Sequence, residues 1–251
     1  MQVIVNNRVV AYEKVGSGPV AVLLHGWADS QASFAQLLPD LKRLYTVITL
    51  DLAGFGGSQP PETAWGLADY AAFVKAFLVK INVGHVHLLV GHSNGGAIAV
   101  YASAHKIIEA DKLILLASSG VRTPGSARKK ALKAVSKVGK LSLAVLPKSR
   151  RQALRARFYT SIGSDLLVAP HMQETFKKVV AQDIQTDAKL IRVPVLLIYG
   201  SNDTATPPLY GQMLTKKLPA ATLKIIEGAG HFVHQESAAA VSALIKEFDP
   251  S

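Results

Sequence analysis

The chain has 251 residues, 49% of them hydrophobic, which is enough to bury one substantial core and excludes a disordered protein. It has no cysteine, which excludes disulfides and thiol chemistry, and no apolar run of the roughly 20 residues that cross a membrane. The net charge of +11 comes from residues 120–160, which hold twelve Lys or Arg and no acid, so the chain as a whole is not expected to bind nucleic acid.

The N-terminus alternates between apolar and polar residues like a β-hairpin. Strands are expected over 3–5 and 9–13, around a turn at Asn6-Asn7. This segment lacks the charged start and the long apolar block of a signal peptide, so the sequence favours a cytoplasmic protein.

Beyond the hairpin, short apolar runs alternate with longer helical patterns. Strands are expected at 20–24, 47–50, 87–90, 113–117, 195–199 and 223–226. Helices are expected at 31–41, 62–79, 94–105, 208–218 and 237–248. Because the strands are almost entirely apolar, the pattern predicts an α/β fold, a mostly parallel central sheet with helices on both faces.

Residues 121–189 interrupt this alternation, since they show several short helical patterns and no clear strand. We expect them to form a helical cap, inserted between two strands of a core domain that comprises residues 1–120 and 190–251. Open α/β sheets bind ligands at the carboxyl ends of their strands, so this cap is expected to lie over the binding site.

The first part of the expected cap is strongly basic. Such a charged run is usually a solvated face, although it would also suit an anionic substrate or an anionic lipid surface. The helical stripe within it favours packing onto the core over contact with a membrane. That stripe comprises Leu132, Val135, Val138 and Leu141.

The most informative motif lies where the strand at 87–90 turns into the helix at 94–105. Ser93 is flanked there by Gly91 and Gly95 in a G-x-S-x-G pattern. Such a turn can push one side chain out on a strained backbone, with small neighbours that let strand and helix approach each other. The alternative is an ordinary glycine-rich turn.

A serine becomes a good nucleophile only when a base takes its proton and a third group orients that base. His231 is the candidate base and Asp203 the candidate acid, because each directly follows a predicted strand, as Ser93 does. The order Ser, Asp, His along the chain fits a G-x-S-x-G turn in such a sheet. Considered alone, Asp203 would be read as a turn former and His231 as a structural or exposed histidine.

Other aspartates fit the role of the acid less well. Asp111 precedes its strand and therefore lies at the opposite edge of the sheet, while Asp183 and Asp187 belong to the expected cap. His85 and His87 alternate around the start of a strand and are interpreted as a surface pair, not a metal site. No cluster of His, Cys, Asp or Glu has the spacing of metal ligands, so neither a metal nor another cofactor is expected.

An oxyanion is stabilised best by donors that do not have to move, such as backbone amides. One candidate is the amide of Asn94, at the positive end of the helix that follows the serine. The other candidate is the amide of Trp27, in a loop that Gly26 allows to pass close to Ser93.

With these motifs the sequence resembles the α/β-hydrolase superfamily, in its compact group of carboxylesterases and carbon–carbon bond hydrolases. The resemblance covers residues 18–120 and 190–250. It rests on HGW at 25–27, DLAGFGGS at 51–58, GHSNGG at 91–96, GSNDTATP at 200–207 and GAGHFVHQE at 228–236. It implies a triad of Ser93, Asp203 and His231, and an oxyanion hole formed by the amides of Trp27 and Asn94.

The resemblance also implies that the 51–58 loop buttresses the site, so Asp51 is structural. Haloalkane dehalogenases and epoxide hydrolases of this fold have an aspartate where Ser93 stands, so their reactions are not expected. Proline iminopeptidases of this fold usually have a G-G-S-W-G nucleophile loop and an acidic cap. This chain has neither, so their reaction is not favoured.

We therefore expect a serine hydrolase that cleaves small-molecule carboxylic esters through an acyl-enzyme intermediate. The alternatives are a carbon–carbon bond hydrolase of a ketone acid, a cofactor-free perhydrolase or haloperoxidase, and a non-catalytic ligand receptor. The sequence predicts neither the natural substrate nor a particular oligomeric state.

Overall fold

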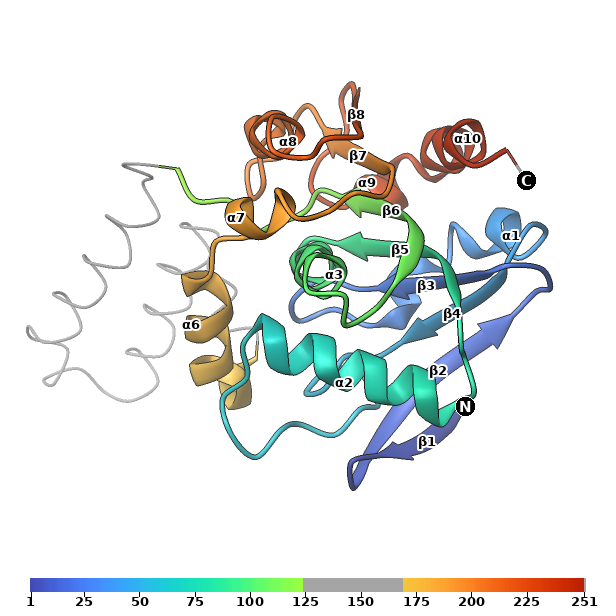
Figure 1. Cartoon of the computed structure of the whole chain (residues 1–251), viewed down its shortest axis with the longest axis vertical. Coiled ribbons are helices and arrows are strands. Elements are labelled where there is room, and N and C mark those ends of the chain that lie inside the picture. The colour runs from blue at the N-terminus through green and yellow to red at the C-terminus, as the bar shows by residue number, and fades with distance from the viewer. Residues whose placement is uncertain (124–168, 251) are drawn as a thin grey trace, which may run out of the picture.

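A central sheet organises the molecule. The computed structural model describes residues 1–123 and 169–250, and Figure 1 shows the sheet between helices on both sides. Its strands are β1 (Gln2–Val5), β2 (Arg8–Val15), β3 (Val20–Leu24), β4 (Thr46–Leu50), β5 (Val86–His92), β6 (Ala110–Leu116), β7 (Val195–Gly200) and β8 (Ala221–Ile226).

The eight strands lie in the order β1-β2-β4-β3-β5-β6-β7-β8. β1 pairs antiparallel with β2, and β2 pairs antiparallel with β4. Every other neighbouring pair is parallel. This confirms the predicted mostly parallel sheet, and all the predicted strands are present with ends shifted by a few residues.

The helices form one layer on each face of the sheet. The described helices are α1 (Leu38–Leu41), α2 (Leu67–Lys80), α3 (Asn94–Ala104), α6 (Gln173–Ala181), α7 (Gln185–Ala188), α8 (Pro208–Thr215), α9 (Val233–Glu236) and α10 (Ala238–Phe248), with 3₁₀ turns at Gln31–Phe34 and Pro170–Met172. α3 packs on β3, β5 and β6, and contacts α2 and α7, while α7 contacts α8. On the other face α9 packs on β7 and on the 3₁₀ turn at Gln31–Phe34, and α10 follows α9.

Three predicted helices differ from the structure in their extent. The helix expected over 31–41 is broken into a 3₁₀ turn and the short α1, with Pro39 in the first turn of α1. The helix expected from residue 62 begins only at Leu67, because Gly66 is its N-cap and Asp69 accepts the Gly66 amide. The helix expected over 208–218 ends already at Thr215.

The segment expected to form the cap, residues 121–189, joins β6 to β7. Residues 121–123 and 169–189 of it are described, and they include α6 and α7. Residues 124–168 lie outside the described residues, as do the apolar stripe and all the basic residues of 120–160 except Arg122. Among the helices of the described ranges, none has the length and apolarity needed to cross a membrane.

A close backbone approach fixes α3 against the sheet. A Cβ on Gly95 would collide with the carbonyl oxygens of Leu24 and His25, and a Cβ on Gly91 would collide with the backbone of Gly95. These two glycines therefore let the start of α3 lie directly on the ends of β3 and β5, which a side chain would prevent.

At the amino edge of the sheet, a polar network ties the last residues of the chain to the strands. Asp249 is buried and accepts hydrogen bonds from Tyr45 Oη at 2.7 Å and Lys112 Nζ at 2.6 Å. His87 Nε2 lies 2.8 Å from Asp249 Oδ2, and His87 Nδ1 lies 2.9 Å from Asp111 Oδ2. His85 contacts the same oxygen of Asp111. His85 and His87 are thus partners of carboxylates, and only His85 is largely exposed.

The network favours the charged forms of its members. Burial of the His87 ring opposes its protonation, but the hydrogen bonds to Asp111 and Asp249 outweigh this and raise the pKa of His87 above 6.5. The hydrogen bonds of His87 and His85 lower the pKa of Asp111. Burial opposes ionisation of Asp249, but Lys112, Tyr45 and His87 together lower its pKa below 3.8.

We predict that Gly95→Ala destabilises the protein by about 3 kcal/mol, because backbone carbonyls of two strand ends would have to move. Urea unfolding at neutral pH measures this free energy. Gly84→Ala is the matched control, since a Cβ at Gly84 meets nothing within 4 Å and should change stability by less than about 0.5 kcal/mol. Equal effects of the two substitutions would contradict the close packing described above.

We also predict that His87→Gln destabilises the protein more at pH 5.5 than at pH 9, by about 0.5 kcal/mol after solvent screening. Because the pKa of His87 is raised on folding, the charged ring stabilises the folded protein. This stabilisation is fully present below pH 6.5 and is lost as the pH rises through the folded-state pKa of His87. The lowered pKa values of the two aspartates keep both ionised at pH 5.5. Urea unfolding at both pH values tests this, with the exposed His85→Gln as the control expected to have a smaller effect. A cost that is independent of pH would show that the charge of His87 is unimportant.

Candidate active site

The site predicted from the sequence lies at the carboxyl edge of the sheet. Ser93 follows β5, Asp203 follows β7 and His231 follows β8. Because these three strands are parallel members of one sheet, their following loops meet at the same edge. The structure brings the three side chains together, with His231 within hydrogen-bonding distance of both Ser93 and Asp203.

Ser93 occupies a strained turn. Its backbone has φ 48° and ψ −113°. Residues other than glycine rarely adopt this conformation, which costs about 1–3 kcal/mol. Its amide donates to the Leu116 carbonyl oxygen at 2.9 Å, and its own carbonyl accepts the amide of Ser119 at 3.0 Å. These bonds to the β6 side hold the turn, so the strain is balanced by the surrounding sheet.

His231 lies between Ser93 and Asp203. Its Nε2 is 3.0 Å from Ser93 Oγ, and its Nδ1 is 2.9 Å from Asp203 Oδ2. A carboxylate only accepts hydrogen bonds, so Nδ1 carries the proton and Nε2 has a lone pair facing the serine hydroxyl. The side chain of His231 is 21% exposed, so a ligand can reach it.

The carboxylate of Asp203 is buried and well supported. Its Oδ1 accepts the amides of Ala205 and Thr206, each at 2.8 Å, and Thr206 Oγ1 lies 2.7 Å from Oδ2. Burial disfavours the charged form, but His231 and the Thr206 groups outweigh this, so the pKa of Asp203 is lowered. The group is therefore ionised at neutral pH.

Of the two amides predicted to hold an oxyanion, that of Trp27 belongs to the loop after β3 and that of Asn94 directly follows Ser93. Within residues 1–123 and 169–250, neither the Trp27 amide nor the Asn94 amide donates a hydrogen bond to another protein group. Asn94 is the first residue of α3, where a helix leaves its amides unsatisfied. A Cβ on Gly26 would lie 3.3 Å from Ser93 Cβ, so this glycine brings the Trp27 loop close to the serine, as expected.

Two buried side chains brace the loops after β3 and β4. The amide of Leu52 donates to His25 Nε2 at 2.8 Å, while His25 Nδ1 donates to the Gly26 carbonyl at 2.7 Å. Asp51 accepts the amide of Gln31 at 2.7 Å on one oxygen and that of Gly57 at 2.8 Å on the other. Neither side chain is free for chemistry, in keeping with the structural role expected for Asp51.

Part of the segment between β6 and β7 lies against this edge. Phe176 of α6 packs on Trp27 with ring centroids 5.1 Å apart, and Phe55 packs on the same ring at 4.9 Å. The amide of Trp65 donates to Thr175 Oγ1 at 3.1 Å, and His171 Nε2 lies 2.9 Å from the carbonyl of Gly54. α6 is therefore anchored to the loops that carry Trp27 and Asp51.

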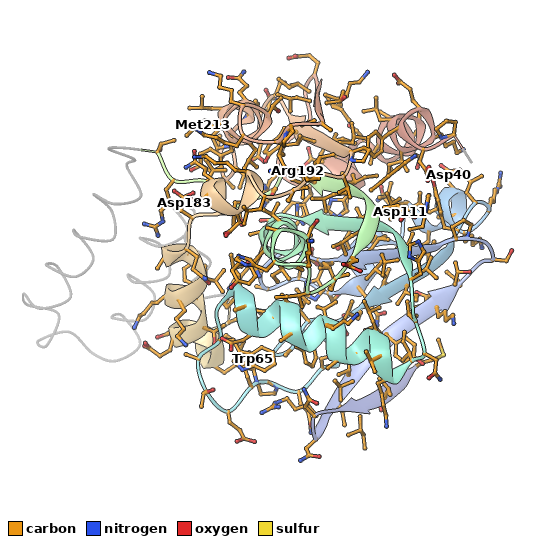
Figure 2. All side chains as sticks on the ribbon, in the orientation of Figure 1. Asp40, Trp65, Asp111, Asp183, Arg192 and Met213 are labelled. Carbon is orange, nitrogen blue, oxygen red and sulfur yellow. The ribbon has the colours of Figure 1, made fainter. Side chains whose placement is uncertain are left out.

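The other aspartates considered for the acid lie elsewhere. Asp111 is in β6 at its amino end, in the network with His87, and Figure 2 shows it far from Asp183, which lies between α6 and α7. Asp187 pairs with His105 at 3.0 Å. None of these three contacts His231 within the described residues.

Several supporting residues were not identified from the sequence. Thr206 holds Asp203, and Glu236 accepts the amides of Gly230 and Phe232, at 2.6 and 3.2 Å, on either side of His231. His92 Nε2 donates to the carbonyl oxygen of His231 at 3.1 Å. The sequence gives only a weak signal for these supporting residues. They are single polar residues in turns, and some of their contacts join loops that are distant in the chain.

Similar proteins are known. A family model described as "Alpha/beta hydrolase family" matches residues 21–244. An uncharacterized protein of Mycobacterium tuberculosis is 26% identical over 271 residues, which cover 95% of this chain and 77% of that protein. The pimeloyl-[acyl-carrier protein] methyl ester esterase of Neisseria meningitidis is 27% identical over 241 residues, which cover 90% of this chain and 91% of the esterase.

The fold agrees with these sequence matches. The enol-lactonase of Burkholderia xenovorans LB400 superimposes with a TM-score of 0.78 at 20% identity, and the match covers all of both chains. The family model spans nearly the whole chain, from β3 to α10, and the parallel strands β3 to β8 and the turn at Ser93 lie within that match. The chain therefore belongs to the alpha/beta hydrolase family, and it is a hydrolase.

Proposed function

We propose that this protein is a serine hydrolase that cleaves carboxylic esters through an acyl-enzyme intermediate. The observation that carries this proposal is the hydrogen-bonded series Ser93, His231 and Asp203. The Neisseria relative, whose name describes an esterase of a methyl ester, supports the choice of an ester bond.

In the proposed reaction His231 Nε2 takes the proton of Ser93 Oγ as the oxygen attacks the ester carbonyl. The carbonyl carbon becomes tetrahedral, and the amides of Trp27 and Asn94 donate to the oxyanion. Collapse breaks the ester bond, and His231 gives its proton to the leaving alcohol. Water then attacks the acyl-enzyme in the same way, which releases the acid and restores Ser93.

Asp203 has a distinct part in this scheme. Its ionised carboxylate keeps the proton of His231 on Nδ1 and stabilises the imidazolium that forms during each proton transfer. The Thr206 and Ala205 amides hold the other carboxylate oxygen, so the acid cannot turn away from the base. This arrangement requires no cofactor.

We further propose that residues 121–189 form a cap over the site and that 1–120 and 190–251 form the core. The anchoring of α6 on Trp27 and on the Trp65 loop supports this division. An aromatic wall of Trp27, Phe55 and Phe176 would then line the approach to Ser93 and favour an apolar part of the substrate.

We predict that Ser93→Ala lowers kcat/KM for short p-nitrophenyl esters by about 10⁴–10⁶-fold without unfolding the protein. The strained turn stays satisfied, since only the hydroxyl is removed. Ser103→Ala, on the same helix α3, is the control and should retain activity. Ser93→Ala activity within tenfold of the wild-type value, in protein free of contaminating esterase, would refute the proposed nucleophile.

The same assay compares esters with a dienoic ketone acid, the substrate type of a carbon–carbon bond hydrolase. Turnover of the ketone acid in preference to all esters would favour the carbon–carbon alternative with the same three residues. Binding of either compound with no turnover, and no labelling of Ser93 by a fluorophosphonate, would indicate a receptor.

For the acid, we predict that Asp203→Asn lowers turnover about 10⁴-fold, because an amide can donate to Nδ1 and so favour the wrong tautomer of His231. Asn still accepts the Ala205 and Thr206 amides, so the loop should keep its shape. Asp111→Asn, at the opposite edge of the sheet, is the control and should leave turnover unchanged. The acid is misassigned if Asp203→Asn is active and Asp111→Asn is not.

A further inference from the structure

Three side chains beside the candidate triad form a second, buried polar cluster. Asp29 comes from the loop after Trp27, His92 from the end of β5, and His234 from α9. One oxygen or nitrogen of each side chain lies within 4.8 Å of the others. His92 and His234 are 1% and 0% exposed, whereas Asp29 is half-buried.

The polar atoms that face this cluster are unpaired. Among the described residues, Asp29 Oδ2, His92 Nδ1 and both ring nitrogens of His234 are buried without a hydrogen-bond partner. Each such atom costs about 1–3 kcal/mol if it stays unsatisfied. Buried, unpaired polar atoms on three neighbouring side chains indicate a site built for a ligand.

The opposite atoms of two of these side chains are already fixed by the protein. Asp29 Oδ1 accepts a hydrogen bond from the amide of Ser30 at 2.8 Å, which leaves Oδ2 as the oxygen available to bind a metal ion. His92 donates from Nε2 to the carbonyl of His231, which puts the lone pair of its ring on Nδ1. A histidine whose other nitrogen donates to a backbone carbonyl is the usual arrangement around a bound metal ion.

The charges of the cluster suit a cation. The two histidine rings are 1% and 0% exposed, and burial disfavours a protonated imidazole, so each ring can offer a lone pair to a cation. The glycine at position 26 leaves room at His92, since a Cβ there would lie 3.0 Å from Nδ1. A cluster of two neutral imidazoles and one carboxylate matches the ligands of Zn²⁺ and related divalent ions.

We propose that Asp29, His92 and His234 bind one divalent transition-metal ion of the Zn²⁺ type. Bonds of about 2.1 Å would draw the three ligand atoms together and satisfy one buried atom of each side chain. The ion would connect the Trp27 loop, strand β5 and helix α9. Its role is structural, and it does not depend on the proposed esterase reaction. This site could not be predicted from the sequence, because its ligands come from three distant segments.

The test is to remove metal from the purified full chain with a chelator and to titrate it with Zn²⁺ by calorimetry. We expect one Zn²⁺ per chain, and a rise of about 5 °C in Tm at saturating Zn²⁺. Co²⁺ should bind at the same stoichiometry and give the visible absorption of a tetrahedral ion. Neither readout uses enzymatic activity.

Two variants and two controls locate the ion. His234→Phe, which keeps a ring against Phe34, and Asp29→Asn should each weaken Zn²⁺ binding at least 100-fold. The surface variant His105→Gln should bind as the wild type does, and so should Ser93→Ala.

The proposal is overturned if the wild type binds neither Zn²⁺ nor Co²⁺ at micromolar concentrations. It is also overturned if His234→Phe and Asp29→Asn bind like the wild type, or if Ser93→Ala abolishes binding, since the ion would then lie on the triad. Loss of esterase activity in Ser93→Ala with Zn²⁺ binding intact would support both proposals separately.

Discussion

The strained backbone of Ser93 is the constraint on which the rest of the site depends. A side chain at φ 48° persists only where its surroundings hold it, and here β6 accepts its amide while Ser119 donates to its carbonyl. The glycines beside it let α3 lie on the ends of β3 and β5. The turn thus places the hydroxyl at the sheet edge and, at the same point, begins helix α3.

The carboxylates of the carboxyl edge differ in how fully the backbone satisfies them. Asp51 and Asp203 are buried and accept backbone amides from their own or neighbouring loops, so each carboxyl group is held in place. Asp29 has only one oxygen satisfied, by the amide of Ser30. This difference separates a buttress and a proposed triad acid from the ligand that we propose for a metal ion.

Histidines at the two edges of the sheet are in opposite electrostatic settings. At the amino edge His87 lies between Asp111 and Asp249, which favour its charged form and fasten the C-terminal residues to the strands. At the carboxyl edge burial keeps His92 and His234 neutral. Histidine therefore forms ion pairs at the amino edge, whereas at the carboxyl edge its neutral ring can offer a lone pair to a metal ion.

The sequence by itself determined the fold class and the residues that meet at the edge. Apolar strands separated by helices predict a parallel sheet, and residues that follow parallel strands must converge, so Ser93, Asp203 and His231 could be proposed together. Only the tertiary structure decided which polar groups support them. Thr206, Glu236 and the cluster of Asp29, His92 and His234 act through contacts between distant segments, and the start of α2 at Leu67 depends on its cap. Local periodicity reports which face of an element is buried, whereas these contacts depend on distances across the fold.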